Sequence, residues 1–201
     1  MALNFASNNS LSAITTLPAS ISGGGMTLIS EQTASSSATI DFTSGIDSTY
    51  DSYVFKFIDI HPATDNTFLT FQSDTGTNTS YNQTITSTFF KSLHNESDST
   101  TALSYDTNSD LAQSTSFQHL SRNGGNDNDQ SIAGTLTIYN PSSSVFVKHF
   151  IGRTNVYTSD DYSIDSFSAG YFNQSTALTR FRFKMSSGNI DSGTIKMYGV
   201  A

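Results

Sequence analysis

Residues 179–185 read Thr-Arg-Phe-Arg-Phe-Lys-Met, and three large apolar side chains alternate there with three cationic ones. Successive side chains of an extended chain point to opposite faces, so this two-residue period predicts a strand with one buried face. Such a strand is typical of antiparallel sheets, in which one face meets the core and the other meets solvent. The apolar face would carry Phe181, Phe183 and Met185, and the cationic face Arg180, Arg182 and Lys184.

The strongest strand in the first half of the chain is Tyr53–Ile60, which ends before Pro62. Its two faces are both apolar except at Lys56, which predicts a central strand between packed layers. Phe55 and Phe57 would lie on one face, and Val54, Ile58 and Ile60 on the other. The next apolar stretch, Thr67–Gln72, is the natural pairing partner across a short loop. Pro62 ends the first strand because proline cannot donate to a sheet hydrogen bond.

Several further stretches have the composition of short strands, and turn residues separate them. Residues 84–93 are ambiguous between a strand and a short helical turn, and the polar residues 95–116 predict a long loop. The connection 186–193, with two glycines and Asn189, predicts a hairpin loop between the last two strands. Further strands are expected over residues 26–29, 39–42, 117–122, 135–139, 145–151, 163–172 and 194–198.

These elements predict an all-β protein with an antiparallel, jelly-roll-like β-sandwich, because no amphipathic helix of about ten residues is present. Residues 1–25 are small and polar and end in Gly23-Gly24-Gly25, which predicts a flexible N-terminal arm. Residues 26–201 would form a single sandwich domain. Fifteen Phe and nine Tyr supply enough bulk for a substantial core, although only 35% of the residues are hydrophobic.

The charge argues against nucleic acid as a partner. The chain has 9 basic and 17 acidic residues, whereas binding to phosphates requires clustered Lys and Arg. Residues 1–147 contain only three of the basic residues, and residues 148–201 contain the other six. This asymmetry fits solvated strand faces, or a head-to-tail contact between copies of the chain. No apolar run approaches the length of a membrane span, so a membrane is not expected as a partner either.

The sequence shows no recognisable reaction centre, metal site or cofactor site. The chain has no cysteine, and its four histidines lack the close spacing of metal ligands. His149, in an apolar strand, is expected to be a hydrogen-bonded packing residue. Asp127 and Asp129 resemble part of a calcium loop without its closing glutamate, and Asp160-Asp161 is expected to be a turn rather than a catalytic pair. We therefore expect no enzyme activity and no cofactor.

Several stretches resemble a family of small structural proteins of marine tailed bacteriophages. The similarity covers most of the chain from about residue 20 onward, and it implies a component of the virion, assembled in the host cytoplasm. The family has no assigned catalytic residues, so the resemblance adds none. The similar stretches are residues 43–53, 57–63, 125–131, 140–143, 183–190 and 193–199.

Two functional hypotheses follow from the composition together with this resemblance. The first is a capsid decoration or other virion surface protein, assembled as a symmetric oligomer, a trimer, on the major capsid protein or on tail proteins. Cationic side chains of the last two strands would contact the partner: Arg180, Arg182, Lys184 and Lys196. The alternative is a tail or tail-fibre component in which loop tyrosines stack on host glycans. Those tyrosines would be Tyr81, Tyr105, Tyr157 and Tyr162.

Overall fold

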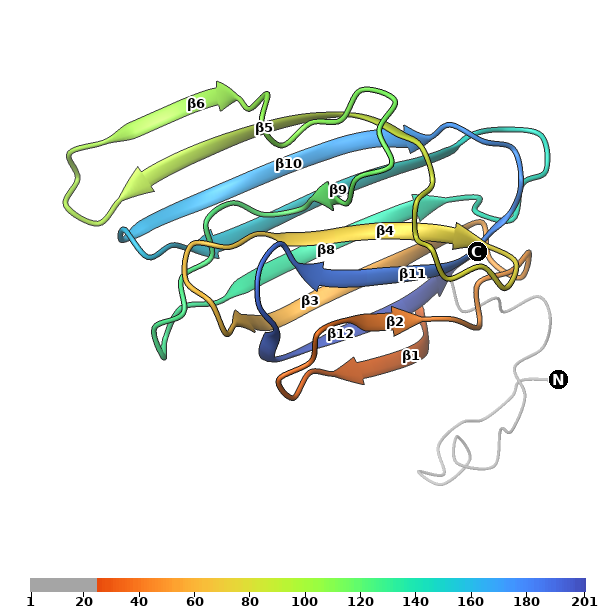
Figure 1. Ribbon diagram of the computed structural model, residues 1–201, viewed down its shortest axis with the longest axis horizontal. Helices are drawn as coiled ribbons and strands as arrows, with labels where there is room; N and C mark the ends of the chain where they lie inside the picture. The colour runs from red at the N-terminus through yellow and green to blue at the C-terminus, as the bar shows by residue number, and fades with distance from the viewer. Residues whose placement is uncertain (1–24) are drawn as a thin grey trace, which may run out of the picture.

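The computed structural model describes residues 25–201, and two antiparallel β-sheets pack face to face in it (Figure 1). The predicted all-β sandwich is therefore confirmed. The predicted arm, residues 1–25, lies outside the described residues except for Gly25. The described residues include no helix that is long and apolar enough to span a bilayer.

The two sheets contain eight and four strands. The larger sheet has the order β1 (Thr27–Thr33), β12 (Ile190–Val200), β3 (Ser52–Pro62), β8 (Ile132–Tyr139), β9 (Lys148–Tyr157), β10 (Tyr162–Phe172), β5 (Ile85–Asn95) and β6 (Thr101–Tyr105). The smaller sheet has the order β2 (Ile40–Phe42), β11 (Leu178–Met185), β4 (Leu69–Thr75) and β7 (Gln118–His119).

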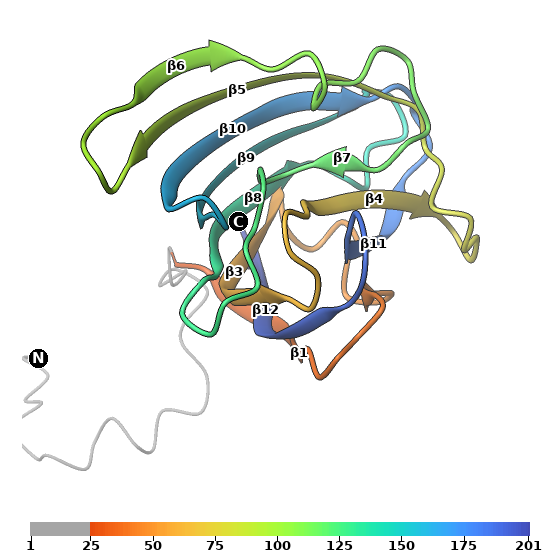
Figure 2. The same ribbon diagram turned by 60° about the vertical axis from the view of Figure 1, so that its left-hand side comes forward.

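Eight of these strands pair in the nested order of a jelly roll. β1 pairs with β12, β2 with β11, β3 with β8, and β4 with β7, so that early strands meet late ones. The remaining four strands form two inserted hairpins, β5–β6 and β9–β10, which extend the larger sheet beyond β8. Figure 2 shows this extension, the strands β9, β10, β5 and β6, reaching past the edge of the smaller sheet.

The core between the sheets is built on the alternation of β11. Phe181, Phe183 and Met185 are buried, while the three cationic side chains between them are partly exposed. The ring of Phe183 lies 5.0 Å from that of Phe55 and 5.3 Å from that of Phe57, both on β3 in the opposite sheet. The two-residue period thus predicted the buried face of β11 correctly.

The predicted pairing of Thr67–Gln72 with Tyr53–Ile60 is wrong. β4 pairs with β11 and β7 in the smaller sheet, whereas β3 pairs with β12 and β8 in the larger one. The predicted hairpin over residues 186–193 is also wrong, because β11 and β12 belong to different sheets. Both errors have the same cause. In a meander, consecutive strands form hairpins within one sheet. In a jelly roll, many connections instead lead from one sheet to the other, as those from β3 to β4 and from β11 to β12 do here.

β3 is covered on one face only, which corrects the prediction of a strand between packed layers. A bulge follows Phe57, where the register with β8 shifts and Asp59 has a φ of 50°. The extra residue turns Ile60 to the same face as Phe57, where it is fully buried. Ile58, on the other face, keeps 40% of its surface exposed.

The middle of the chain contains more strand than the sequence indicates. β5 resolves the ambiguous residues 84–93 as a strand, and β6 lies inside the predicted loop 95–116. All five residues of β6 are exposed, so no apolar period marks it. Only Gln118–His119 of the expected strand 117–122 pairs, as β7. Between them residues 106–114 run back along β5, where the N–H of Asp106 donates to the carbonyl of Phe89 over 2.9 Å.

A half-buried polar cluster fixes this returning segment. Asp106 accepts a hydrogen bond from Lys91 Nζ over 2.8 Å, and Arg122 Nε lies 3.2 Å from the same carboxylate oxygen. The guanidinium of Arg122 also lies over the ring of Phe68, which stacks on His119 at 4.7 Å. The cluster therefore links the end of β6, the middle of β5 and the residues around β7.

His119 is expected to make folding stability fall in mild acid. Burial lowers the pKa of His119, and the charge of Arg122 lowers it further. The unfolded chain takes up a proton near pH 6.5, whereas the folded chain does so only at lower pH. The free energy of unfolding should then decrease as the pH falls from about 6.5 toward the folded pKa. A His119→Phe variant keeps the stack on Phe68 but cannot take up this proton. In urea titrations its free energy of unfolding should therefore fall less than that of the wild type as the pH is lowered. Identical pH profiles for the two proteins would contradict it.

Candidate functional site

The four predicted contact residues do not form one surface. Arg180, Arg182 and Lys184 point outward from β11 in the smaller sheet, whereas Lys196 lies on β12 in the larger sheet. In each strand the neighbouring side chains face the core between the sheets, so the two sets lie on opposite outer faces of the sandwich. A single basic face is therefore not present.

Two of these cations already have partners within the chain. Arg182 donates two hydrogen bonds to Asp41, of 2.8 and 2.6 Å, and its guanidinium lies 4.0 Å from the centroid of the Tyr81 ring. Lys196 Nζ lies 3.0 Å from Glu31. Among residues 25–201, Arg180 and Lys184 have no ion pair. A contact role for cations of the smaller sheet therefore depends mainly on these two side chains.

The four tyrosines that were predicted to lie in loops differ in their access to a ligand. The loop prediction holds only for Tyr81, since the other three are terminal residues of the strands β6, β9 and β10. Tyr81 is buried beside Arg182, so it cannot stack on a glycan. Tyr105 is 53% exposed, and its hydroxyl donates to Asp110 over 2.6 Å. Tyr157 donates to Asp161 over 3.2 Å, and Tyr162 packs against the core. These side chains are not gathered in one site.

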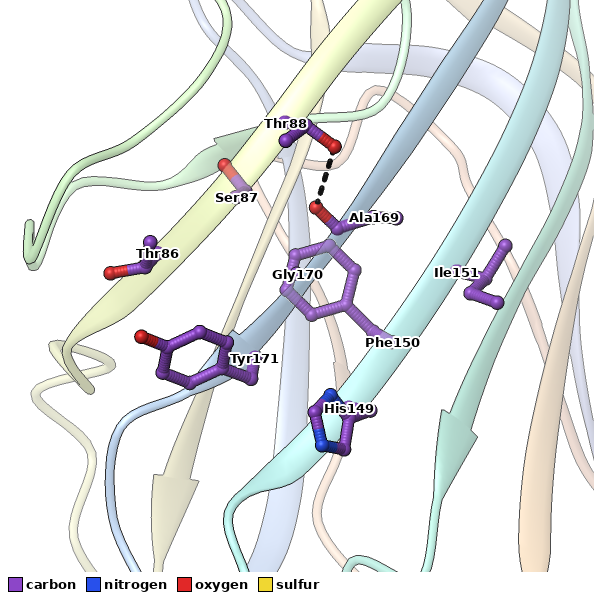
Figure 3. Close-up of a pocket in the computed structure, with 9 residues that line it drawn as sticks. All are labelled: Thr86, Ser87, Thr88, His149, Phe150, Ile151, Ala169, Gly170 and Tyr171. Carbon is purple, nitrogen blue, oxygen red and sulfur yellow. Dashed lines mark hydrogen bonds between the residues drawn. The ribbon is translucent and has the colours of Figure 1, made fainter.

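A mostly apolar hollow lies on the outer face of the extension, across β5, β10 and β9 (Figure 3). It is a groove of about 450 Å³, and we call it the outer groove. No charged side chain lines it. The lining residues are Thr86, Ser87, Thr88, His149, Phe150, Ile151, Ala169, Gly170 and Tyr171.

Strand register brings these residues together from three parts of the chain. Thr86 is opposite Tyr171, and Tyr171 is opposite His149. In the adjacent row Thr88, Ala169 and Ile151 align in the same way. Their alternation with buried neighbours places them on the solvent side of the sheet.

His149 was expected to be a hydrogen-bonded packing residue, and this is wrong. Its side chain is exposed, because Lys148 and Phe150 are the residues of β9 that face inward there. The ring of His149 lies 6.0 Å from that of Tyr171, at an interplanar angle of 60°. Within residues 25–201 neither ring makes a hydrogen bond to the protein. The outer groove therefore presents an aromatic pair with free polar atoms.

Two small residues form the floor of the outer groove. Ala169 leaves the space between Thr88 and Ile151 unfilled, and Gly170 lets β5 and β10 approach closely. A Cβ atom on Gly170 would lie 2.4 Å from the carbonyl oxygen of Thr86 and 2.8 Å from the Cα of Ser87. Since both are backbone atoms, a larger residue would have to separate the two strands.

Hydrogen bonds hold the polar side chains of the groove in place. Thr86 Oγ1 accepts from both the backbone N–H and the side-chain amide of Gln113, over 3.2 and 2.5 Å. Gln113 in turn accepts from Asn173 Nδ2 over 2.6 Å. Thr88 Oγ1 donates to the carbonyl of Ala169 over 3.4 Å, as Figure 3 shows.

The nearest charges on the same face neutralise each other. Arg153 on β9 donates to Asp165 on β10 from Nε over 3.1 Å and from Nη2 over 2.7 Å. The Arg153 guanidinium also lies over the ring of Phe167, 4.9 Å from its centroid. These two charges therefore offset each other, and no charged side chain lines the outer groove itself.

The described residues do not bring together a metal site. Among residues 25–201 no group of three or more His, Cys, Asp or Glu side chains is placed to hold a metal ion. Asp127 lies in a turn that the N–H of Gln130 closes on its carbonyl over 2.9 Å. Asp160 and Asp161 lie in the turn between β9 and β10, as predicted.

The chain matches no family model, no curated protein and no solved structure. The strand order alone defines the structural class. The chain is a jelly-roll sandwich with a two-hairpin extension of its larger sheet.

Proposed function

We propose that the chain is a non-catalytic structural protein of a bacteriophage virion, a capsid decoration or other surface protein that assembles as a symmetric oligomer. The observation that carries this proposal is the outer edge of β6, a strand that pairs only with β5 among residues 25–201. This strand, Thr-Ala-Leu-Ser-Tyr, is exposed at every residue and contains no charge and no proline. Edge strands of monomeric proteins usually carry charged residues or proline, which prevent pairing with another chain. β6 lacks this protection, so its edge is suited to pairing with a second chain.

Exposed apolar side chains around this edge support a protein contact. Leu103 is 74% exposed, and Tyr105 and Phe90 are 53% and 41% exposed. Phe90 and Tyr105 are directly opposite in the register of β5 and β6, and Phe90 stacks on Phe167 at 4.6 Å. Contiguous apolar surface of this kind marks interaction sites in soluble proteins.

The stretches that resemble phage structural proteins support the same proposal, because they hold the sandwich together. The N–H of Asn140 donates to the carbonyl of Asp51 over 2.7 Å, which joins two of the stretches. His61 Nδ1 lies 2.8 Å from the carbonyl oxygen of Gln130, which joins two more. The N–H of Ala63 bonds the carbonyl of Asn189 over 3.0 Å. These hydrogen bonds place the similar stretches in the scaffold of the sandwich.

Sedimentation velocity tests the assembly directly. At about 100 µM we expect a species of three times the chain mass of 21.7 kDa, and a Leu103→Lys variant should sediment as a monomer because a charge is costly in a buried apolar contact. Val145→Lys is the matched control, since Val145 is 72% exposed in the loop between β8 and β9, away from β6. A wild-type monomer at this concentration, or an oligomer that Leu103→Lys leaves intact, would contradict assembly through β6.

A further inference from the structure

We propose that the outer groove binds a neutral saccharide of one or two sugar units. The inference concerns a different surface from the β6 edge, and it stands whether or not the chain assembles through that edge. Its volume of about 450 Å³ falls within the usual range for small-molecule pockets, roughly 300–1,000 Å³.

The lining selects against charged ligands. None of the nine lining residues is charged, and the nearest ion pair, Arg153–Asp165, is internally satisfied. A phosphate or carboxylate would lose its hydration without gaining a cation at this site. A purely apolar chain would in turn leave the polar atoms of Tyr171 and His149 without partners. The groove therefore fits a ligand that is both uncharged and rich in hydroxyl groups.

The side chains provide the two kinds of contact that a sugar makes. The Tyr171 ring, between Thr86 and His149 in Figure 3, offers a flat apolar surface for the C–H face of a pyranose. Its hydroxyl and the ring nitrogens of His149 can donate to or accept from the sugar hydroxyls. Ile151, 54% exposed, forms the apolar wall on the β9 side.

The groove is already rigid, which favours binding of a small ligand. All nine residues lie on strands β5, β9 and β10, and Gln113 and Asn173 fix the hydroxyl of Thr86. Side chains that are fixed before binding lose little entropy on binding.

Saturation-transfer-difference NMR tests this proposal on the full chain. The probes are lactose, maltose, cellobiose and N,N′-diacetylchitobiose, with sialyllactose as the anionic comparison. We expect at least one neutral disaccharide to show transfer and to bind more tightly than sialyllactose. No transfer from any of the four, or preferential binding of sialyllactose, would overturn the proposal.

Variants show whether the bound sugar occupies the outer groove. Tyr171→Ala should weaken binding at least about ten-fold through loss of the aromatic surface, and Ala169→Leu should block it by filling the floor. Tyr198→Ala is the matched control, because Tyr198 lies on the outer face of β12, three strands away from β9 in the larger sheet, and does not line the groove. Circular dichroism verifies that each variant is folded. Equal losses for Tyr171→Ala and Tyr198→Ala, or binding that Ala169→Leu leaves unchanged, would place the sugar elsewhere.

Discussion

Replacing Phe183 with alanine should lower the free energy of unfolding by about 3–5 kcal/mol, as large-to-small changes at buried aromatic positions do. The Phe183 ring is fully buried and contacts four other rings, those of Phe42, Phe55, Phe57 and Phe71. These four rings come from both sheets, so the cavity would open at the point where the layers meet. A domain of this size is typically stable by about 5–15 kcal/mol, so this loss would be a large part of the total.

Urea denaturation measures this effect, with Phe146→Ala as the matched control. Phe146 is 69% exposed in the loop between β8 and β9, and the same chemical change there should cost less than about 1 kcal/mol. A loss below about 1 kcal/mol for Phe183→Ala would show that the two sheets are not packed through this ring.

Replacing Asp106 with asparagine should cost about 2–3 kcal/mol. The substitution leaves Lys91 and Arg122 without their shared counter-charge, and breaking a fully buried ion pair costs about 3–5 kcal/mol. We expect less than this because the side chains of Lys91 and Arg122 keep 18% and 15% of their exposure. The matched control is Asp165→Asn, whose partner Arg153 is 65% exposed, and it should cost less than about 1 kcal/mol.

The Asp106 contribution also has a defined pH dependence. Burial raises the pKa of Asp106, but the hydrogen bonds from Lys91 and from the N–H of Asn108, with the charge of Arg122, lower it by more. A carboxyl with a lowered folded pKa stabilises the protein above its unfolded pKa of about 3.9, and this stability is lost as the pH falls through the folded pKa. The difference in unfolding free energy between wild type and Asp106→Asn should therefore be full at pH 6 and shrink below pH 4. A difference that stays constant between pH 6 and pH 3 would contradict this ion pair.

The strands with a strong apolar period could be predicted from the sequence, but their neighbours could not. The alternation of Phe181 and Phe183 with cations identifies the buried face of β11, because side-chain direction is a local property of an extended chain. Pairing is not local in a jelly roll. β1 pairs with β12, although most of the chain separates them in sequence, and no local sequence pattern identifies such a pair. β6 is exposed at every residue, so it has no apolar pattern to detect.

The candidate site was missed for the same reason. Thr86, His149 and Tyr171 are far apart in the sequence, and only the register of β5, β10 and β9 aligns them. The expected role of His149 failed because apolar neighbours in a sequence do not show which face of a strand is covered. The cations at Arg182 and Lys196 were conspicuous in the sequence, yet each has a carboxylate partner within the fold. A conspicuous cation in the sequence therefore did not indicate a side chain that is available to bind a partner.

The most direct test of the proposed function is a cryo-electron-microscopy reconstruction of purified particles of a phage whose genome encodes this chain. The account predicts density for the jelly-roll sandwich at symmetry-related positions on the particle, with the β6 edge against a neighbouring copy. Repetition over the capsid would identify a decoration protein, and confinement to the tail would favour the glycan-binding alternative. Absence of the chain from purified particles would contradict the virion assignment.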